Sequence, residues 1–124
     1  MPSRRINREV VVRGMHLEAE TIAYMGYLTV LPSISIQIAI NNLVKELKIT
    51  NIWWLLDRLW LFVSETQQAA RISLVNPSST AITEVNSPTW TEYQRYNGNG
   101  VDMYLNTNFN LNTQGVNYTQ NNAS

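Results

Sequence analysis

The sequence predicts an α+β fold in which an N-terminal arm and short helices precede a small antiparallel β-sheet. Apolar residues recur at helical spacing between residues 34 and 48, whereas residues 101–109 alternate between apolar and polar, as a half-buried strand does. Composition changes near Asn76–Pro77, since both lysines precede it and nine asparagines fall in the last 28 residues. We therefore divide the chain into an arm (1–15), a helical segment (16–75) and a strand-rich segment (76–124).

The arm combines positive charge with a short apolar run. Its arginines are Arg4, Arg5, Arg8 and Arg13. The run Val10, Val11 and Val12 is much shorter than the roughly 7–15 apolar residues of a signal peptide, so none is predicted. Phosphate binding by the arginines is a weaker interpretation, because Glu9 and the valines lie between them. We expect the valines to pair, as an extended strand, with a neighbouring subunit.

Two helices are expected next. Residues 19–28 form the shorter one, which ends near Leu31–Pro32. Alternate isoleucines from residue 34 fit a strand, but a longer pattern fits a helix: Ile36, Ile40, Leu43, Val44 and Leu47. A Pro-Ser start and Lys45 and Lys48 in the last turn also favour a helix.

The remainder of the helical segment predicts shorter elements. Asn51 is a plausible cap for a helix that ends near Arg58, and residues 59–63 (LWLFV) fit a buried strand. Thr66 is the expected cap of a further helix over residues 67–75. Asp57 suggests a catalytic carboxylate, but we favour a structural role beside Arg58.

Residues 88–96 and 101–109 predict two strands joined by a turn at YNGNG, where glycine and asparagine tolerate positive φ. Trp90 points inward on the first strand. The second strand directs four apolar side chains toward a core: Val101, Met103, Leu105 and Phe109. Residues 115–120 (GVNYTQ) are a candidate third strand of a sheet with one polar face.

Composition limits the function. A chain of 124 residues has room for one core, its formal net charge is zero, and it has no cysteine. We therefore expect no nucleic-acid partner, no disulfide and no thiol chemistry. The longest apolar stretch, NIWWLLDRLWLFV, falls well below the roughly 20 residues that cross a bilayer, so no membrane partner is expected.

No catalytic, metal or cofactor site is predicted. His16 is the single histidine, and a metal site needs several clustered ligands. Glu84, Glu92 and Asp102 are the candidate carboxylates for glycoside hydrolysis, but they fall on polar faces of the expected strands. The sequence thus indicates a protein that is not an enzyme.

Two sets of aromatic residues are candidates for binding. Trp53 and Trp54 are expected to anchor an assembly interface or the helical core, and plain core packing is expected of Trp60. Tyr93, Tyr96 and Tyr104 lie among asparagines, a combination that suits sugar rings. The alternative for these tyrosines is a solvated strand face.

Three stretches together resemble a group of phage and prophage virion-associated proteins, tail-fibre-like or head-decorating: AYMGYLTVLPS, IWWLLDRLWLFVSETQQAARISLVNPSSTAITEVNSPTW and YNGNGVDMYLNTNFN. The last stretch is similar to the opening strands of a concanavalin-like (laminin-G-like) β-sandwich, the fold of many lectin-type domains. The resemblance covers roughly residues 23–124 and supplies no catalytic residues. It implies either a truncated relative, an incomplete lectin-like sandwich that other subunits complete, or a chain whose last residues are poorly ordered.

These observations lead to two expected functions. The first is a non-enzymatic structural protein of a phage virion, a head (capsid) or tail component that binds other virion proteins and forms homo-oligomers. The second is a glycan-binding module of a phage fibre or receptor-binding protein. Unpaired edges of a small sheet favour association, which supports the first.

Overall fold

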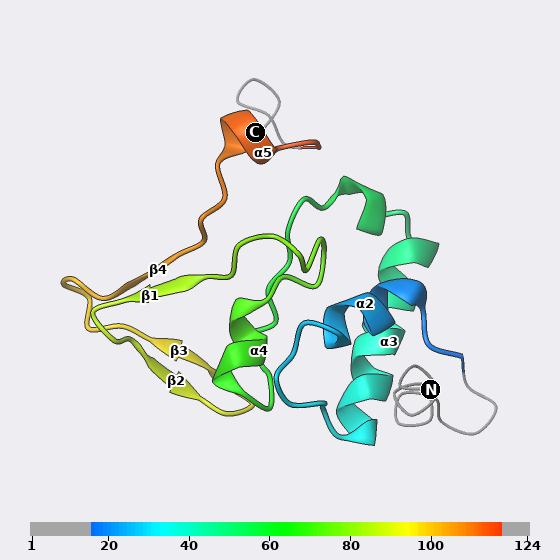
Figure 1. The fold of residues 1–124 in the computed structure, drawn as a ribbon, viewed down its shortest axis with the longest axis horizontal. Coiled ribbons are helices and arrows are strands. Elements are labelled where there is room, and N and C mark those ends of the chain that lie inside the picture. The colour runs from blue at the N-terminus through cyan, green and yellow to red at the C-terminus, as the bar shows by residue number, and fades with distance from the viewer. Residues whose placement is uncertain (1–15, 118–124) are drawn as a thin grey trace.

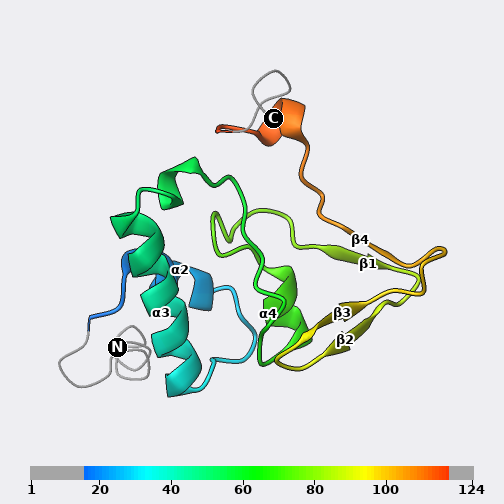
Figure 2. The same ribbon diagram turned by 180° about the vertical axis from the view of Figure 1, so that it is seen from behind.

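The computed structural model describes residues 16–117, and their element order confirms the predicted α+β class. The helical elements are α2 (Ala19–Met25), α3 (Ile34–Ile49), the 3₁₀ turn η1 (Trp53–Leu55), α4 (Gln67–Arg71) and α5 (Leu111–Gln114). The strands are β1 (Thr83–Val85), β2 (Thr89–Thr91), β3 (Arg95–Asn97) and β4 (Tyr104–Asn106). Helix α4 lies between the α2–α3 pair and the strands, as the two opposite views show (Figures 1 and 2).

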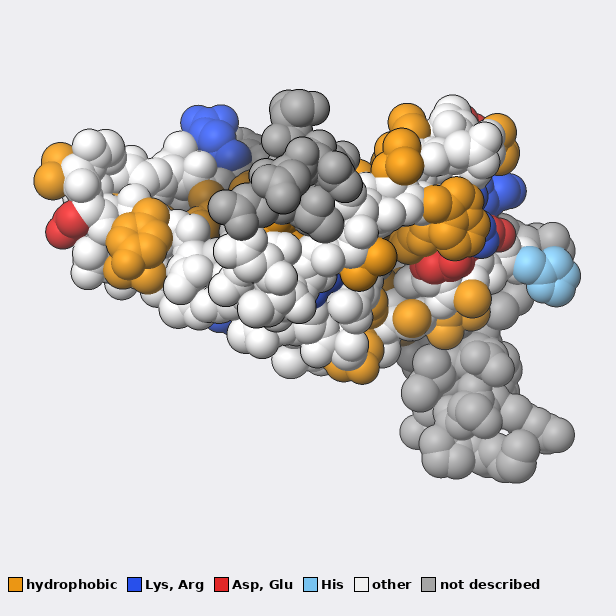
Figure 3. Space-filling view, turned by 90° about the horizontal axis from the view of Figure 1, so that it is seen from above, with side chains coloured by type: hydrophobic (Ala, Val, Ile, Leu, Met, Phe, Trp, Pro, Cys, Tyr) orange, Lys and Arg blue, Asp and Glu red, His pale blue; other side chains and the backbone are white. Residues whose placement is uncertain are grey.

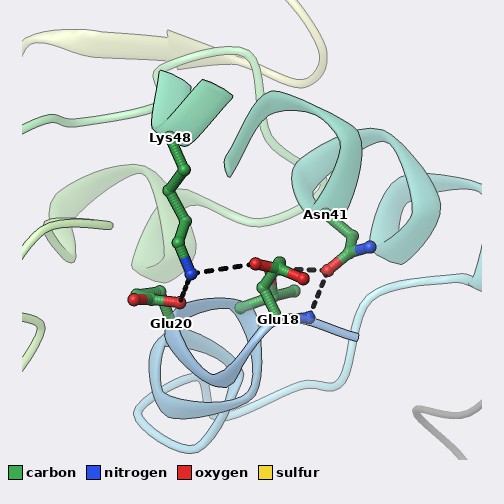
Figure 4. Close-up of polar contacts among 5 residues, drawn as sticks. Glu18, Glu20, Asn41 and Lys48 are labelled. Atoms are coloured by element: carbon green, nitrogen blue, oxygen red, sulfur yellow. Dashed lines mark hydrogen bonds and ion pairs between the residues drawn. The ribbon is translucent and has the colours of Figure 1, made fainter. Parts of the chain in front are cut away.

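Polar contacts fix the start of α2 against α3 (Figure 4). The buried Asn41 side chain accepts hydrogen bonds through Oδ1 from the Glu18 backbone N–H, at 2.6 Å, and from the Thr21 hydroxyl, at 3.1 Å. Lys48 forms ion pairs with Glu18 at 2.9 Å and Glu20 at 3.2 Å. Hydrogen bonds to Glu18 and then Glu20 raise the pKa of Lys48. The two helices of the prediction thus pack against each other, joined by residues 26–33.

The hydrophobic core lies where α2, α3 and the residues after α4 meet. It comprises Leu17, Tyr24, Met25, Ile40, Val44, Trp53 and Leu74. Tyr24 is 1% exposed, and its hydroxyl donates to the Ala69 carbonyl at 3.1 Å, which connects α2 to α4. Burial raises the pKa of Tyr24 to about 12, so this hydroxyl stays protonated and keeps its hydrogen bond at neutral pH.

The predicted helix after Asn51 and the predicted strand at residues 59–63 are both wrong. Asn51 has a φ of 61° immediately after α3, so it turns the chain out of α3 rather than capping a new helix. Only the three-residue η1 follows. Residues 59–63 form a single bridge, Trp60 with Ser73, because residues 61–63 pack along α3 rather than beside a strand.

The predicted Thr66 cap is confirmed, since the Thr66 hydroxyl accepts a hydrogen bond from the Ala69 N–H at 3.1 Å. Helix α4 ends at Arg71, however, and not near residue 75 as expected. The reason is the competing backbone contact that follows: the Leu74 N–H donates to the Leu59 carbonyl at 2.7 Å, which draws residues 72–75 out of the helix.

The strands form two nested antiparallel pairs rather than one sheet. β1 pairs with β4, and β2 pairs with β3. In the sequence, the β2–β3 pair lies between β1 and β4. Residues 88–96, expected to be one strand, therefore fold back on themselves at a turn where Tyr93 has a φ of 60°. Trp90 is half-buried, and its indole N–H donates to the Phe62 carbonyl at 3.1 Å, which fixes the inner hairpin to the segment along α3.

The expected strand over residues 101–109 is reduced to β4. The Asn99 side chain accepts hydrogen bonds from the N–H groups of residues 101, 102 and 103, and this local turn competes with strand pairing. Val101 is consequently 87% exposed, whereas Met103, Leu105 and Phe109 are half-buried. Residues 115–117 are not in a strand, and the rest of the expected third strand lies outside the described residues.

Candidate functional site

An open apolar pocket of about 380 Å³ lies along one side of α3. One wall is a stripe of α3 side chains, Ile36, Ala39, Ile40 and Leu43, at the i, i+3, i+4, i+7 spacing that gathers residues on one face. The other wall is the segment 60–63. We call this feature the α3 groove. The pocket-facing surface is almost wholly apolar, so it suits an apolar segment better than a polar ligand.

Acidic residues lie beyond both ends of the α3 groove. At the start of α3, the Glu65 carboxylate accepts a hydrogen bond from the Ser33 N–H at 3.1 Å. The pKa of Tyr93 is raised, first by desolvation and then by Glu65 and Glu92. Both carboxylates therefore lie near the Tyr93 hydroxyl. At the other end, the exposed Glu46 lies one helical turn beyond Leu43 on the same side of α3.

A second apolar surface lies at the η1 end of the molecule. Its members are Ile49 (70% exposed), Ile52 (43%), Trp54 (57%) and Leu55 (57%), and we call it the η1 patch. Figure 3 looks at the molecule from this side and shows hydrophobic side chains gathered beside basic and acidic ones. The Lys48 ammonium lies 6.0 Å from the centre of the Trp54 ring, so charged groups border the patch.

The residues predicted to form an assembly interface fall in different places. Val10, Val11 and Val12 lie outside the described residues. Trp53 is 7% exposed and belongs to the core, whereas its neighbour Trp54 faces outward in the η1 patch. Trp60 is half-buried and lines the α3 groove rather than the core cluster.

The three candidate glycan-binding tyrosines do not share one face. Tyr93 is 47% exposed in the β2–β3 turn, and Tyr104 is 57% exposed at the start of β4, toward the opposite end of the hairpins. Tyr96 packs edge-on against Phe62 with ring centres 5.3 Å apart, and its hydroxyl is buried. Burial and the adjacent Glu84 raise the pKa of Tyr96, so this hydroxyl stays protonated.

The candidate catalytic carboxylates are likewise separated. Glu84 on β1 accepts a hydrogen bond from the Gln67 amide, Glu92 is exposed in the β2–β3 turn, and Asp102 accepts from the Asn99 amide in the loop before β4. His16 is exposed at the start of the described chain. Within residues 16–117, no three His, Asp or Glu side chains are grouped as a metal site would require.

Asp57 has a structural role. Its buried carboxylate accepts hydrogen bonds from the backbone N–H groups of Val116, at 3.1 Å, and Asn117, at 3.0 Å. The neighbouring Arg58 guanidinium donates to the Asp57 backbone carbonyl at 2.7 Å and lies 4.9 Å from the centre of the Phe109 ring. Together, Asp57 and Arg58 hold the residues after β4 against the region of η1.

The sequence did not identify the α3 groove or most of the η1 patch. Its apolar residues were assigned to a core, because helical spacing marks an apolar face without showing what covers it. One signal was present. The apolar positions Ile36, Ile40, Leu43 and Val44 spread over about 100° of the α3 surface, and α2 covers only part of that surface.

Comparison with known proteins adds no relative: no family model, curated protein or solved structure matches the chain. Among the described residues, no helix is both long and apolar enough to span a membrane. The α3 groove and the η1 patch are therefore the features on which a functional proposal rests.

Proposed function

We propose that this chain is a non-enzymatic structural subunit of a phage virion, which assembles with other copies and other virion proteins through its exposed apolar surfaces. The observation that supports assembly is the exposed η1 patch. Four large apolar side chains are grouped there, and each is at least 43% exposed. Exposed apolar surface of this kind marks interaction sites, and tryptophan is prominent among residues that contribute most to binding.

The virion assignment is supported by the resemblance of residues 23–124 to phage head and tail proteins. Small strand pairs are consistent with it, because a two-stranded sheet has little stability of its own and exposes edges that other chains can pair with.

Replacing Trp54 by serine tests the role of the η1 patch. We expect the dissociation constant for self-association to rise roughly 10- to 100-fold, because an exposed aromatic anchor contributes about 1.4–3 kcal/mol to binding. Sedimentation velocity over a concentration series measures this change. Trp54→Ser leaves the core intact, since the indole is 57% exposed.

Tyr104→Ser is the matched control, because Tyr104 is also 57% exposed but lies on β4, outside the η1 patch. Its dissociation constant should equal that of the unaltered chain. Equal affinity for Trp54→Ser and the unaltered chain would remove the η1 patch from the interface.

Glycan binding is the second candidate, and the exposed rings of Tyr93 and Tyr104 favour it. These rings lie toward opposite ends of the hairpins, so each would bind a sugar separately. A glycan array with the unaltered chain and with Tyr104→Ser tests this candidate, and absence of any bound glycan argues against it.

A further inference from the structure

The α3 groove and the N-terminal arm match in apolar character, in length and in charge. The arm places Glu9 and three valines between Arg8 and Arg13, and the groove places an apolar stripe between Glu65 and Glu46. An extended segment from Arg8 to Arg13 spans about 17 Å at roughly 3.3 Å per residue. The α3 helix rises about 20 Å from Ser33, which contacts Glu65, to Glu46.

We propose that the α3 groove binds the Arg8–Arg13 segment of a second copy of this chain. Either Val11 or the pair Val10 and Val12 enters the apolar groove, since side chains alternate along an extended segment, and the flanking arginines approach the acidic residues at its ends. The inference rests on the proposed function, because it adds a second contact, besides the η1 patch, through which copies assemble. It also gives the arm the strand-like role that its β-branched residues favour.

The chain's own arm is poorly placed for this groove. Glu18 is fixed to Asn41, which lies roughly 150° around α3 from the middle of the groove at about 100° per residue. That arc around the helix and its side chains is about 13–16 Å at a radius of roughly 5–6 Å, and the five residues from Glu18 to Arg13 extend at most about 17 Å. The arm of the same chain would therefore have to be almost fully extended to reach the groove, whereas the arm of a neighbour has no such tether.

Disulfide cross-linking tests the proposal, and the absence of native cysteine makes the result unambiguous. Val11→Cys or Val12→Cys samples either side of the extended arm, and Ala39→Cys places a thiol on the exposed wall of the groove. Each arm variant is mixed with the groove variant under mild oxidation, and the mixed dimer is identified by non-reducing electrophoresis and peptide mass spectrometry. Lys45→Cys, exposed on the opposite side of α3, is the matched control.

We expect one arm variant to form at least about tenfold more mixed dimer with Ala39→Cys than with Lys45→Cys, because a disulfide requires Cα atoms within about 7 Å. Equal yields would overturn the proposal. So would a cross-link confined within single chains of the double variant Val11→Cys/Ala39→Cys.

Sedimentation of the unaltered chain separates this inference from the proposed function. If the chain associates but the arm and groove do not cross-link, the inference fails and the proposed assembly function stands. If the chain is monomeric at every concentration, both fail. Val11→Asp and Val12→Asp provide a second readout, since the one that places a carboxylate in the groove should weaken association at least about tenfold.

Discussion

Replacing Tyr24 by alanine is expected to lower the free energy of unfolding by about 3–5 kcal/mol, as for other large aromatic residues removed from a core. The ring is 1% exposed within the core cluster, so its loss leaves a cavity. The Ala69 carbonyl also loses its hydrogen bond from the Tyr24 hydroxyl. Urea denaturation followed by tryptophan fluorescence measures the change.

Two variants separate the contribution of the buried Tyr24 ring to stability from that of its hydroxyl and from that of an exposed ring. Tyr24→Phe keeps the ring and should lower the free energy of unfolding by only about 1 kcal/mol, the usual value of one hydrogen bond. Tyr27→Ala removes a ring that is 49% exposed, just beyond the end of α2, and should change stability much less. A cost for Tyr24→Ala below that of Tyr27→Ala would contradict the described core.

Asp57→Ala is expected to release the C-terminal residues of the described chain and to lower the free energy of unfolding by about 1.5–3 kcal/mol. The carboxylate accepts backbone hydrogen bonds from Val116 and Asn117, and Asp57 is 6% exposed. Without it, these two N–H groups turn to solvent. Hydrogen exchange resolved by residue should therefore accelerate at positions 116 and 117 before it changes in α3.

Asp102→Ala is the control for this prediction, since Asp102 is exposed and its carboxylate accepts from the neighbouring Asn99 amide. It should leave exchange at residues 116 and 117 unchanged. If Asp57→Ala also leaves that exchange unchanged, Asp57 does not hold the C-terminal residues.

The fold class and the longest helix could be predicted from sequence because local pattern determines them. The α3 pattern continues for about four turns, so helix period outweighs the alternating isoleucines at its start. Thr66 was recognised as a cap because capping depends on a side chain and a backbone N–H only three residues apart.

The strands were harder to predict because their pairing depends on backbone turns that alternation does not reveal. Tyr93 takes a positive φ, a conformation that a non-glycine residue adopts uncommonly, and this turns one expected strand into a hairpin. The Asn99 turn shortens β4 in the same way. In the candidate site, Trp54 was named from the sequence as a candidate interface residue. The α3 groove could not be predicted, because its position depends on which side of α3 the α2 helix covers.

Sedimentation equilibrium of the unaltered chain, across dilutions from high to low micromolar concentration, tests the central claim most directly. Assembly through apolar surfaces predicts an average mass that rises with concentration above the 14.2 kDa of one chain. A mass of 14.2 kDa at every concentration would contradict the claim that this protein is a self-assembling structural subunit.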